Sequence, residues 1–224
     1  PYNEAGSRLR LVKKLSDRWD LNWMTDYQYV NQNGFAYGEY DINSDVTASP
    51  TNNRESSYRR NMLNSVLNFK YTSLGITINS TTSYQFLKDK MHMDQDYTSL
   101  DYMHLLQVQQ QNGITQEFTV KRNNRKWNYT TGAFCSYQWQ HTDAPVFFDG
   151  DFKSNLANTI ESAAHGFIKV GGIDMSAPGL FHTPQFNIGV FHESSLDITE
   201  KLVMTIGLRY DYSHFKIEYP TSAV

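Results

Sequence analysis

The densest group of side chains that could bind a metal ion lies in the segment MHMDQDYTSLDYMH, residues 91–104. Methionine and histidine suit copper or haem iron, whereas aspartate oxygens suit calcium. The spacing within this segment matches no known ligand pattern, and the polarity of a solvated loop explains the same composition. The other histidines are scattered along the chain. We therefore expect neither a metal site nor a cofactor.

The carboxylates Asp149 and Asp151, in the segment FFDGDF, are candidates for general acid–base chemistry, which needs two such groups in one cleft. They flank Gly150 and suit turn geometry better. The glycines of 165–181 precede no helix that could bind phosphate. The sequence contains no nucleophile elbow, phosphate loop or zinc-protease motif. We expect no catalytic residues, and therefore not an enzyme.

Aromatic side chains in irregular segments are the remaining candidates for ligand contact, because they can stack on a flat or glycan ligand. The alternative is that these aromatics only pack within their own loops. The predicted ligand-binding residues are Tyr37 and Tyr40 in the first such segment, and His141, Phe147 and Phe148 in the largest.

The elements that would position these residues are strands with two different faces. In KLVMTIGLRYDY (201–212) apolar and polar residues alternate strictly, which is typical of a strand exposed differently on its two sides. On the polar side, Arg209 can pair with Asp211 or Glu193. The apolar side carries Leu202, Met204, Ile206, Leu208, Tyr210 and Tyr212.

The segment WNYTTGAFCSYQW (127–139) has aromatic residues near both ends of one face and small residues between them. From Trp127 to Tyr137 the strand is roughly 33 Å long, or about 25 Å along a tilted barrel axis. That distance matches the height of the lipid-facing band between two aromatic girdles. A soluble sheet has no reason to space aromatics by a bilayer.

The rest of the chain continues this pattern as an all-β protein of eight strands in four hairpins. Short turns are expected at 15–18, 71–74, 122–125 and 197–200, and long irregular loops at about 31–58, 89–112 and 141–184. Compact soluble domains rarely need several such loops. The predicted strands are 7–15, 18–30, 60–71, 74–86, 114–121, 127–139, 185–196 and 201–212.

Composition is consistent with this fold class. Mean hydropathy is -0.58, and no stretch approaches the ~18 apolar residues of a membrane helix. A barrel strand is apolar only at every second position, so barrels remain possible. The net charge of -3 argues against nucleic acid, and the single Cys135 excludes an internal disulfide framework.

Alternating short turns and long loops are the rule in outer-membrane barrels, where the turns are periplasmic and the loops extracellular. With that orientation, the chain begins and ends on the extracellular side. Complete barrels of this kind normally have both termini on the periplasmic side. We therefore expect residues 1–224 to form an incomplete transmembrane β-barrel domain, with unpaired edges at 8–15 and 201–216.

The segment NIGVFHESSLDITEKLVMTIGLRYDYSH (187–214) resembles a strand pair of TonB-dependent outer-membrane receptors. In that family a strand leads through a Leu-Thr-x-x-Leu-like turn into a strand that ends Gly-x-Arg-Tyr-Asp. Here the turn is 198–202 and the strand ends at 207–211. The segments TQEFTV (115–120) and TTGAFCSYQW (130–139) resemble the family's Gln-Glu and Gly-Ala-Phe strands.

The resemblance implies a barrel of about 22 strands with a plug domain, located in the bacterial outer membrane. It also implies uptake of a siderophore, haem, cobalamin or glycan, driven by the TonB complex. The implied partners are outer-membrane lipid, the nutrient and TonB, the last through an N-terminal region that this sequence lacks. The plug domain and the closing strand are lacking too.

Two other functions remain open. One is a passive, porin-like outer-membrane barrel, which an upstream plug domain would exclude. The other is a soluble β-sandwich that binds glycans or acts in adhesion. A sandwich predicts that the apolar face of 202–208 is buried against a second sheet.

Overall fold

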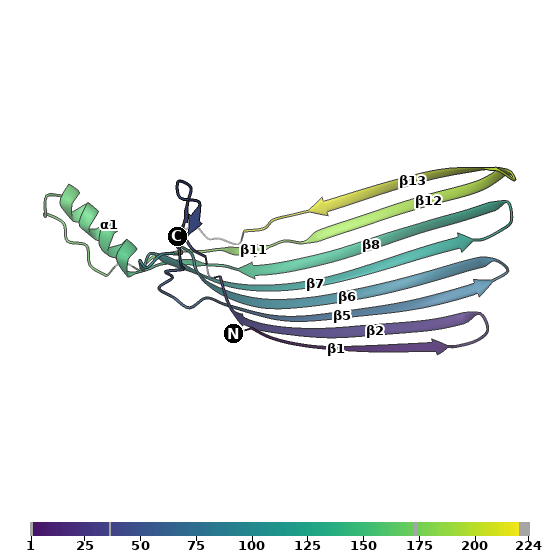
Figure 1. The fold of residues 1–224 in the computed structure, drawn as a ribbon, viewed down its shortest axis with the longest axis horizontal. Helices are drawn as coiled ribbons and strands as arrows, with labels where there is room; N and C mark the ends of the chain where they lie inside the picture. Colours follow the sequence, from purple (N-terminus) through teal and green to yellow (C-terminus); the bar gives the residue numbers. More distant parts are fainter. Residues whose placement is uncertain (1, 36, 173, 220–224) are drawn as a thin grey trace.

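The computed structural model describes residues 2–35, 37–172 and 174–219. Eight long strands form one curved sheet, and they follow one another in chain order as an antiparallel meander (Figure 1). The strands are β1 (Tyr2–Lys14), β2 (Trp19–Asn33), β5 (Ser57–Ser73), β6 (Ile76–Asp94), β7 (Met103–Arg122), β8 (Trp127–Asp143), β12 (Gln185–Thr199) and β13 (Leu202–Phe215).

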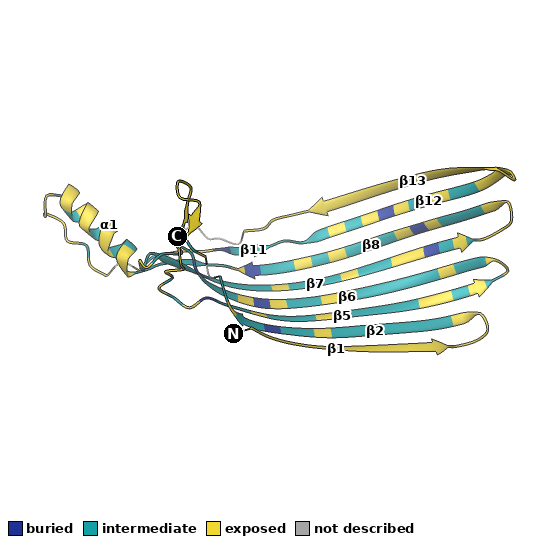
Figure 2. Cartoon of the chain, viewed as in Figure 1, coloured by how far each residue is buried: buried dark blue, intermediate teal, exposed yellow. Residues whose placement is uncertain are grey.

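The predicted architecture of eight strands in four hairpins is therefore confirmed. The order across the sheet is β1-β2-β5-β6-β7-β8-β12-β13. Among the described residues, β1 pairs only with β2, and β13 pairs only with β12 along the sheet. These two strands are the expected unpaired edges, and both are exposed throughout (Figure 2).

Short turns join the strands of each hairpin at one end of the sheet, at the right in Figure 1. Between β5 and β6 the turn consists of Leu74 and Gly75, with φ of 48° and 76°. Two successive positive φ values are the mark of the tightest hairpin turns. The turn predicted at 71–74 is wrong by two residues, since the second strand starts at Ile76. The alternation of apolar and polar residues does not by itself locate the point where the chain reverses.

The long connections gather at the opposite end of the sheet, which we call the loop end. β1 begins there and β13 ends there, as predicted (Figure 1). Its small elements are β3 (Tyr40–Asp41), β4 (Val46–Thr47), β9 (Val146–Phe148), α1 (Gly150–Ala163), β10 (Ser176–Ala177) and β11 (Leu180–His182).

Helix α1 lies within the segment 141–184, which we predicted to be an irregular loop, so the prediction is wrong there. Phe152, Leu156 and Ile160 recur every four residues along the helix, but none of its residues is buried. Within the described residues, no helix combines the length and the apolar character needed to cross a membrane.

The strands are longer than predicted at the loop end. The expected loop 89–112 is wrong, since β6 continues to Asp94 and β7 starts at Met103, leaving only 95–102 between them. With 20 residues, β7 is about 66 Å long, well beyond the roughly 9–11 residues that cross a bilayer. A strand that has left the bilayer no longer needs an apolar face, so the backbone ladder continues where the period stops.

The register assigns the two faces of the sheet, because residues directly opposite in an antiparallel pair point the same way. One row across the outward face is mostly apolar: Leu21, Phe69, Ser80, Phe118, Ala133, Val190 and Tyr210. The adjacent row on the inward face is mostly polar: Asn22, Asn68, Thr81, Glu117, Phe134, Gly189 and Asp211. The predicted alternation is confirmed.

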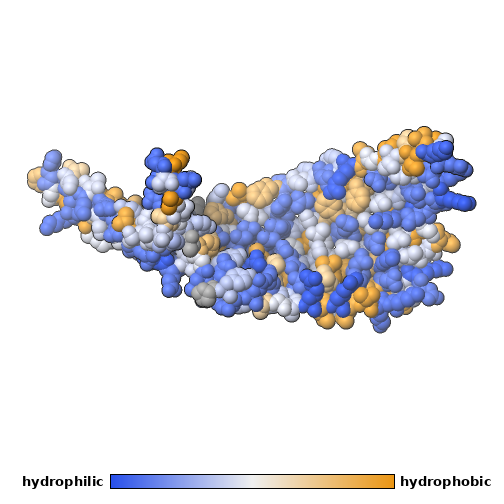
Figure 3. Space-filling view, viewed as in Figure 1, coloured by the Kyte–Doolittle hydropathy of each residue, from blue (hydrophilic) through white to orange (hydrophobic). Residues whose placement is uncertain are grey.

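The sheet is a single layer without a core of its own. Of the apolar side chains described, only Val30 and Leu105 are buried. Ile206 is 60% and Leu208 77% exposed, so the described residues include no second sheet over this face, and the sandwich alternative is wrong. Figure 3 shows hydrophilic side chains around the short turns and over α1, with apolar ones gathered between them over the strands.

Candidate ligand-facing site at the loop end

One arginine joins three loops at the loop end. Arg54 precedes β5, Asp101 precedes β7, and Asp149 precedes α1. An Arg54 Nη2 lies 2.9 Å from Asp101 Oδ1 and 3.0 Å from Asp149 Oδ1. A guanidinium holds several donors in a fixed plane, so it can fix both carboxylates at once. We call Arg54, Asp101, Asp149 and His104 the Arg54 cluster.

His104, at the start of β7, completes the cluster. Its Nδ1 lies 2.6 Å from Asp149 Oδ2, and its ring stacks on Phe147 with centroids 5.0 Å apart. The amide of Gly150 donates to Asp101 Oδ2 at 3.1 Å, which ties the start of α1 to the same carboxylates. The loops before β5, β7 and α1 are therefore held as one unit.

The electrostatics around Asp101 favour its ionised form. Partial desolvation acts to raise the pKa of Asp101, but Arg54 and the Gly150 amide lower it more, so this pKa lies below its usual range. Asp149 is mostly shielded, with its side chain 12% exposed. The arrangement contains no nucleophile with an adjacent base, and every charged group already has a partner. It suits loop positioning rather than catalysis.

The predicted ligand-binding residues form three groups by their position in the chain: Tyr37 with Tyr40, His141 alone, and Phe147 with Phe148. Phe147 and Phe148 lie in β9, where Phe147 stacks on His104 and Phe148 contacts Phe152 at a centroid distance of 4.7 Å. Tyr37 packs edge-on against Tyr97, with centroids 5.0 Å apart, and remains 52% exposed.

Tyr40, in β3, donates its hydroxyl to Asp45 Oδ1 at 2.6 Å and is also exposed. His141 lies at the end of β8, with its ring 4.6 Å from the ring of His182. No ring contact among the described residues joins these three groups to one another. Their role in ligand binding stays a prediction.

The sequence contained no signal for Arg54, Asp101 or His104 as a cluster. Arg54 and Asp101 are 47 residues apart, and only the meander brings them together. The segment 91–104 contains the densest group of potential metal ligands in the sequence. His92 and His104 meet edge to face with centroids 5.4 Å apart. In the part of the chain that the structure describes, no group of three or more His, Cys, Asp or Glu side chains is placed to hold a metal ion.

Below the loops, the inward face carries a row of linked amides. Asn64 donates to Asp26 Oδ2 at 3.0 Å, Gln85 donates to Asn64 Oδ1 at 2.9 Å, and Gln111 donates to Gln85 Oε1 at 3.2 Å. These side chains come from β2, β5, β6 and β7 in turn. The wall beneath the loop end therefore presents hydrogen-bonding groups to whatever occupies the interior.

Towards β13, the inward face holds a second cluster. Arg209 binds Asp211 through two hydrogen bonds of 2.7 and 2.8 Å, which confirms one of the two predicted partners. Its guanidinium also lies 5.4 Å from the ring centre of Phe134 and 5.8 Å from that of Phe191. The charge of Arg209 is thus paired with Asp211 and lies near two aromatic rings, while its side chain remains 57% exposed.

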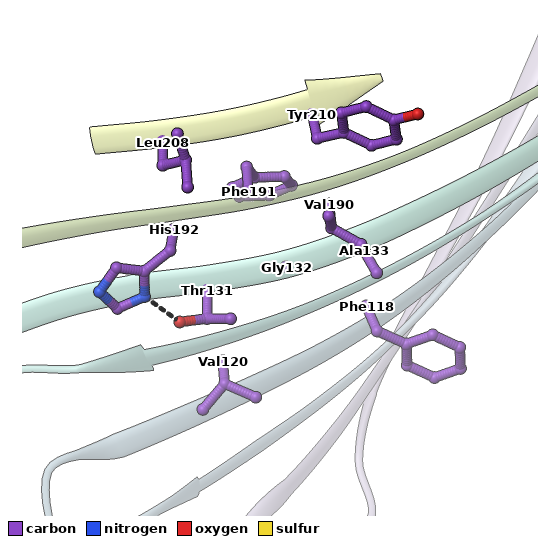
Figure 4. A pocket seen from close by; sticks show the side chains of 10 residues that line it. All are labelled: Phe118, Val120, Thr131, Gly132, Ala133, Val190, Phe191, His192, Leu208 and Tyr210. Carbon is purple, nitrogen blue, oxygen red and sulfur yellow. Dashed lines mark hydrogen bonds between the residues drawn. The ribbon is translucent and has the colours of Figure 1, made fainter. Parts of the chain in front are cut away.

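An apolar hollow of about 460 Å³ opens on the sheet away from the loop end (Figure 4). Thr131 and Ala133 are among its lining residues, and a hydrogen bond of 2.6 Å joins Thr131 Oγ1 to His192 Nδ1. Most of the remaining lining comes from outward-facing residues, so this hollow belongs to the apolar face and not to the ligand-facing site. Its other lining residues are Phe118, Val120, Gly132, Val190, Phe191, Leu208 and Tyr210.

No family model and no curated protein matches the chain. Solved structures do match, at low sequence identity. The ferric yersiniabactin uptake receptor FyuA of Yersinia pestis superimposes with a TM-score of 0.70 and 13% identity, over 95% of this chain and 30% of FyuA. The siderophore receptor PiuA of Acinetobacter baumannii gives 0.68 and 13%, over 99% and 37%.

A third match is the ferripyoverdine receptor of the outer membrane of Pseudomonas aeruginosa, with a TM-score of 0.61 and 12% identity, over 98% of this chain and 32% of the receptor. The chain thus spans about a third of the length of these structures. At such identities the likeness concerns the fold. The chain has the fold of a section of the barrel wall of TonB-dependent siderophore receptors.

Proposed function

We propose that this chain is part of an outer-membrane receptor that takes up a scarce nutrient, and that it supplies a section of the barrel wall together with its ligand-facing loops. The observation that carries the proposal is the pair of unlike faces on a single-layer sheet. Apolar side chains line most of the outward face of the eight-stranded sheet, and mostly polar ones line the inward face. Water cannot cover such an apolar surface at low free energy, whereas lipid can.

The ends of the outward face support the bilayer placement. Near the short turns, the ring centroids of Trp127 and Tyr129 are 5.1 Å apart. Towards the loop end, those of Tyr137 and Trp139 are 5.6 Å apart. Between them lie Thr131, Ala133 and Cys135. Aromatic pairs separated by small residues are what two interfacial girdles require. In this placement the short turns are periplasmic and the long loops extracellular.

The loop end is then the first part of the chain that an external ligand meets. We propose that Tyr37, Tyr40, His141, Phe147 and Phe148 contribute to its ligand-facing surface, on loops held by the Arg54 cluster. A ferric siderophore is the substrate class to test first, since the similar structures named above are receptors of that kind. Haem, cobalamin and glycans are the other classes.

The proposal assigns no catalytic step to this chain. Residues 1–224 are one incomplete barrel domain in this scheme, and other segments of the receptor contribute the remaining strands, the plug and the contact with TonB. The partners are outer-membrane lipid, the nutrient and the TonB complex. No nucleic acid is involved.

The test is uptake of a labelled ferric siderophore by cells that contain the intact receptor, in strains with and without TonB. We expect saturable uptake that is lost when either the receptor or TonB is deleted. Equal uptake without TonB would contradict the proposal and favour the passive, porin-like alternative.

A further inference from the structure

A short network of polar side chains lies on the outward face near the short turns. Trp127 Nε1 donates to Ser194 Oγ at 3.1 Å, and His192 Nε2 lies 2.8 Å from the same oxygen. His192 Nδ1 in turn lies 2.6 Å from Thr131 Oγ1. Thr131 is opposite His192 in the register, and Tyr129 is opposite Ser194, so these side chains share one face. We call Trp127, Ser194, His192 and Thr131 the interfacial network.

The interfacial network carries more donor hydrogens than its own hydrogen bonds use. An indole N–H, two hydroxyls and a neutral imidazole supply four hydrogens, and the network makes three hydrogen bonds. The remaining hydrogen belongs to the hydroxyl of Thr131 or of Ser194, depending on which nitrogen of His192 is protonated. Among the described residues, neither hydroxyl has a further acceptor. In an apolar surrounding, a donor without an acceptor is costly.

An apolar hollow adjoins the interfacial network on its side towards the loop end. Its volume is about 460 Å³, and Thr131 and His192 line the end nearest the short turns (Figure 4). Ala133, the next outward residue of β8, is small, so the surface is low there. Phe118 on β7 and Tyr210 on β13 stand at either side and are 54% and 67% exposed. The hollow therefore has a polar end and an apolar remainder.

The order of these features matches the order of groups in a phospholipid. In the proposed placement, Trp127 and Tyr129 lie at the periplasmic interface, and Ala133 lies further into the bilayer. A diacyl phospholipid of that leaflet presents its phosphate and ester oxygens at the interface and its acyl chains towards the middle. The spare hydrogen of the network thus lies at the depth of the lipid's acceptors, and the hollow lies at the depth of its acyl chains.

We propose that this part of the outward face binds one diacyl phospholipid of the periplasmic leaflet. An acyl chain lies in the hollow, and the spare hydroxyl hydrogen of the interfacial network is donated to an ester carbonyl oxygen. The inference rests on the proposed function, because it requires the outward face to lie in a bilayer. It adds a site for a single lipid molecule to a face that elsewhere contacts lipid without a matching hollow and donor.

The test uses the intact receptor in a mild detergent, titrated with dipalmitoyl phosphatidylethanolamine and followed by native mass spectrometry. We expect the wild type to bind one phospholipid more tightly than any further ones. Ala133→Leu places a larger side chain in the hollow and displaces about two methylene groups of the acyl chain. Binding of the first phospholipid should therefore weaken by roughly tenfold.

The hydrogen bond is tested with a second lipid instead of a second variant. Di-O-hexadecyl phosphatidylethanolamine has the same chain length and headgroup but ether links, so it lacks the carbonyl acceptors. It should bind the wild type more weakly by roughly threefold or more, the usual effect of one hydrogen bond within a membrane. Equal affinity for the two lipids would overturn the role given to the interfacial network.

Cys135→Leu is the matched control for the hollow. Cys135 is the next outward residue of β8 after Ala133 but does not line the hollow, so this variant should bind phospholipid as the wild type does. Equal binding by the wild type and Ala133→Leu, or an equal loss in Cys135→Leu, would overturn the site. A lipopolysaccharide or a second receptor molecule bound there in place of the phospholipid would overturn it as well.

Failure of this inference can be told apart from failure of the proposed function. Quenching of a label on Cys135 by brominated lipids reports whether the outward face contacts the bilayer at all. Strong quenching without a tight phospholipid would refute the lipid site alone. Weak quenching would refute the proposed placement of the whole face together with the site.

Discussion

Single residues at the loop end carry more of the tertiary organisation than the strands do there. Arg54 contacts two carboxylates from two other loops, and Asp149 is shared between Arg54 and His104. On the inward face, single glycines admit aromatic rings: Gly132 is opposite Phe191 in the register. Each arrangement depends on one side chain, or on the lack of one, and so can be tested by one substitution.

Replacing Arg54 by alanine should loosen the loop end. Asp101 and Asp149 would then face each other without a cation, at a cost of about 1–2 kcal/mol after allowance for solvent screening. Limited proteolysis should cut the segment 144–184 faster, while the strands stay protected. Lys153→Ala is the matched control, because Lys153 pairs only with the fully exposed Asp174. Equal cleavage of the two variants would contradict a positioning role for Arg54.

Gly132→Ala should destabilise the sheet. A Cβ there would lie 2.4 Å from Phe191 Cζ and 2.8 Å from the backbone oxygen of Phe118, and the backbone cannot move away. We expect a loss of about 1–3 kcal/mol, the usual cost of overpacking, seen as a lower urea midpoint of the protein in detergent. Gly171→Ala has open space around its Cβ and should leave the midpoint within error.

The loop 95–102 should lose order in acid. Burial acts to raise the pKa of Asp96, but hydrogen bonds from Thr98, Met103 and Tyr102 lower it more, so its pKa in the folded loop lies below the usual range. A lowered carboxyl pKa stabilises the fold above the unfolded value of about 3.9 and is lost as pH falls through the folded value. After correction for the intrinsic pH dependence of amide exchange, the protection factors in this loop should therefore fall below about pH 4.

The variant Asp96→Asn supplies the comparison for this acid effect. An amide oxygen accepts more weakly than a carboxylate, so the protection factors of Thr98 and Tyr102 should already be low at neutral pH and change little on acidification. An acid response as steep as that of the wild type would assign the effect to another group.

At the scale of elements, the hairpins differ in how well their turns suit the chain reversal. Leu74, in the β5–β6 turn, is 98% exposed and has a φ of 48°, a region that a leucine rarely adopts. Gly75 has a φ of 76° and needs no side chain there. The turn therefore contains Leu74, which is poorly suited to a positive φ, directly before Gly75, which is well suited to it.

Leu74→Asn should stabilise the β5–β6 hairpin, because Asn tolerates a positive φ and Asn-Gly is the preferred pair for a two-residue turn. The gain should be about 0.5–1 kcal/mol, within the roughly 1–2 kcal/mol penalty of the left-handed region. A higher urea midpoint in detergent would show it. Leu15→Asn is the control in another short turn, where φ is negative, and should bring no gain.

For the whole molecule, the proposed function requires the outward face to contact lipid. Cys135 is the only cysteine, is exposed, and faces outward between Trp127 and Trp139, four residues from Trp139. Ser136 is its neighbour on the inward face, where Asn187 donates to it at 3.0 Å. The chain therefore contains a natural reporter site on one face and a matched site on the other.

A bimane label on Cys135 of the intact receptor in liposomes should be strongly quenched by lipids brominated in their acyl chains. The same label on Ser136→Cys, in a Cys135→Ser background, should be quenched much less, because it faces the barrel interior. Equal quenching at the two positions would mean that the outward face does not contact the bilayer.

Sequence alone determined the strands, their two faces and the division into short turns and long loops. The bilayer imposes a period of two on every strand it contains, and that period is visible in residues 127–139 and 201–212. The alternation therefore predicted the sheet correctly, and the resemblance around 187–214 pointed to the fold that the solved structures share.

Only the tertiary structure decided what lies outside the bilayer. There the backbone hydrogen bonds between strands continue, but neither face of the strands is apolar. The sequence of the extended parts of β6 and β7 therefore shows no alternation that would predict a strand. Helix α1 buries none of its residues, and the spacing of Phe152, Leu156 and Ile160 was too short a signal among the polar residues of its loop. Strand register across the meander brings together Arg54 with Asp101 and His141 with His182. Their separation along the chain, 47 and 41 residues, does not predict these contacts. The histidine pair at the loop end thus exists only in the folded sheet.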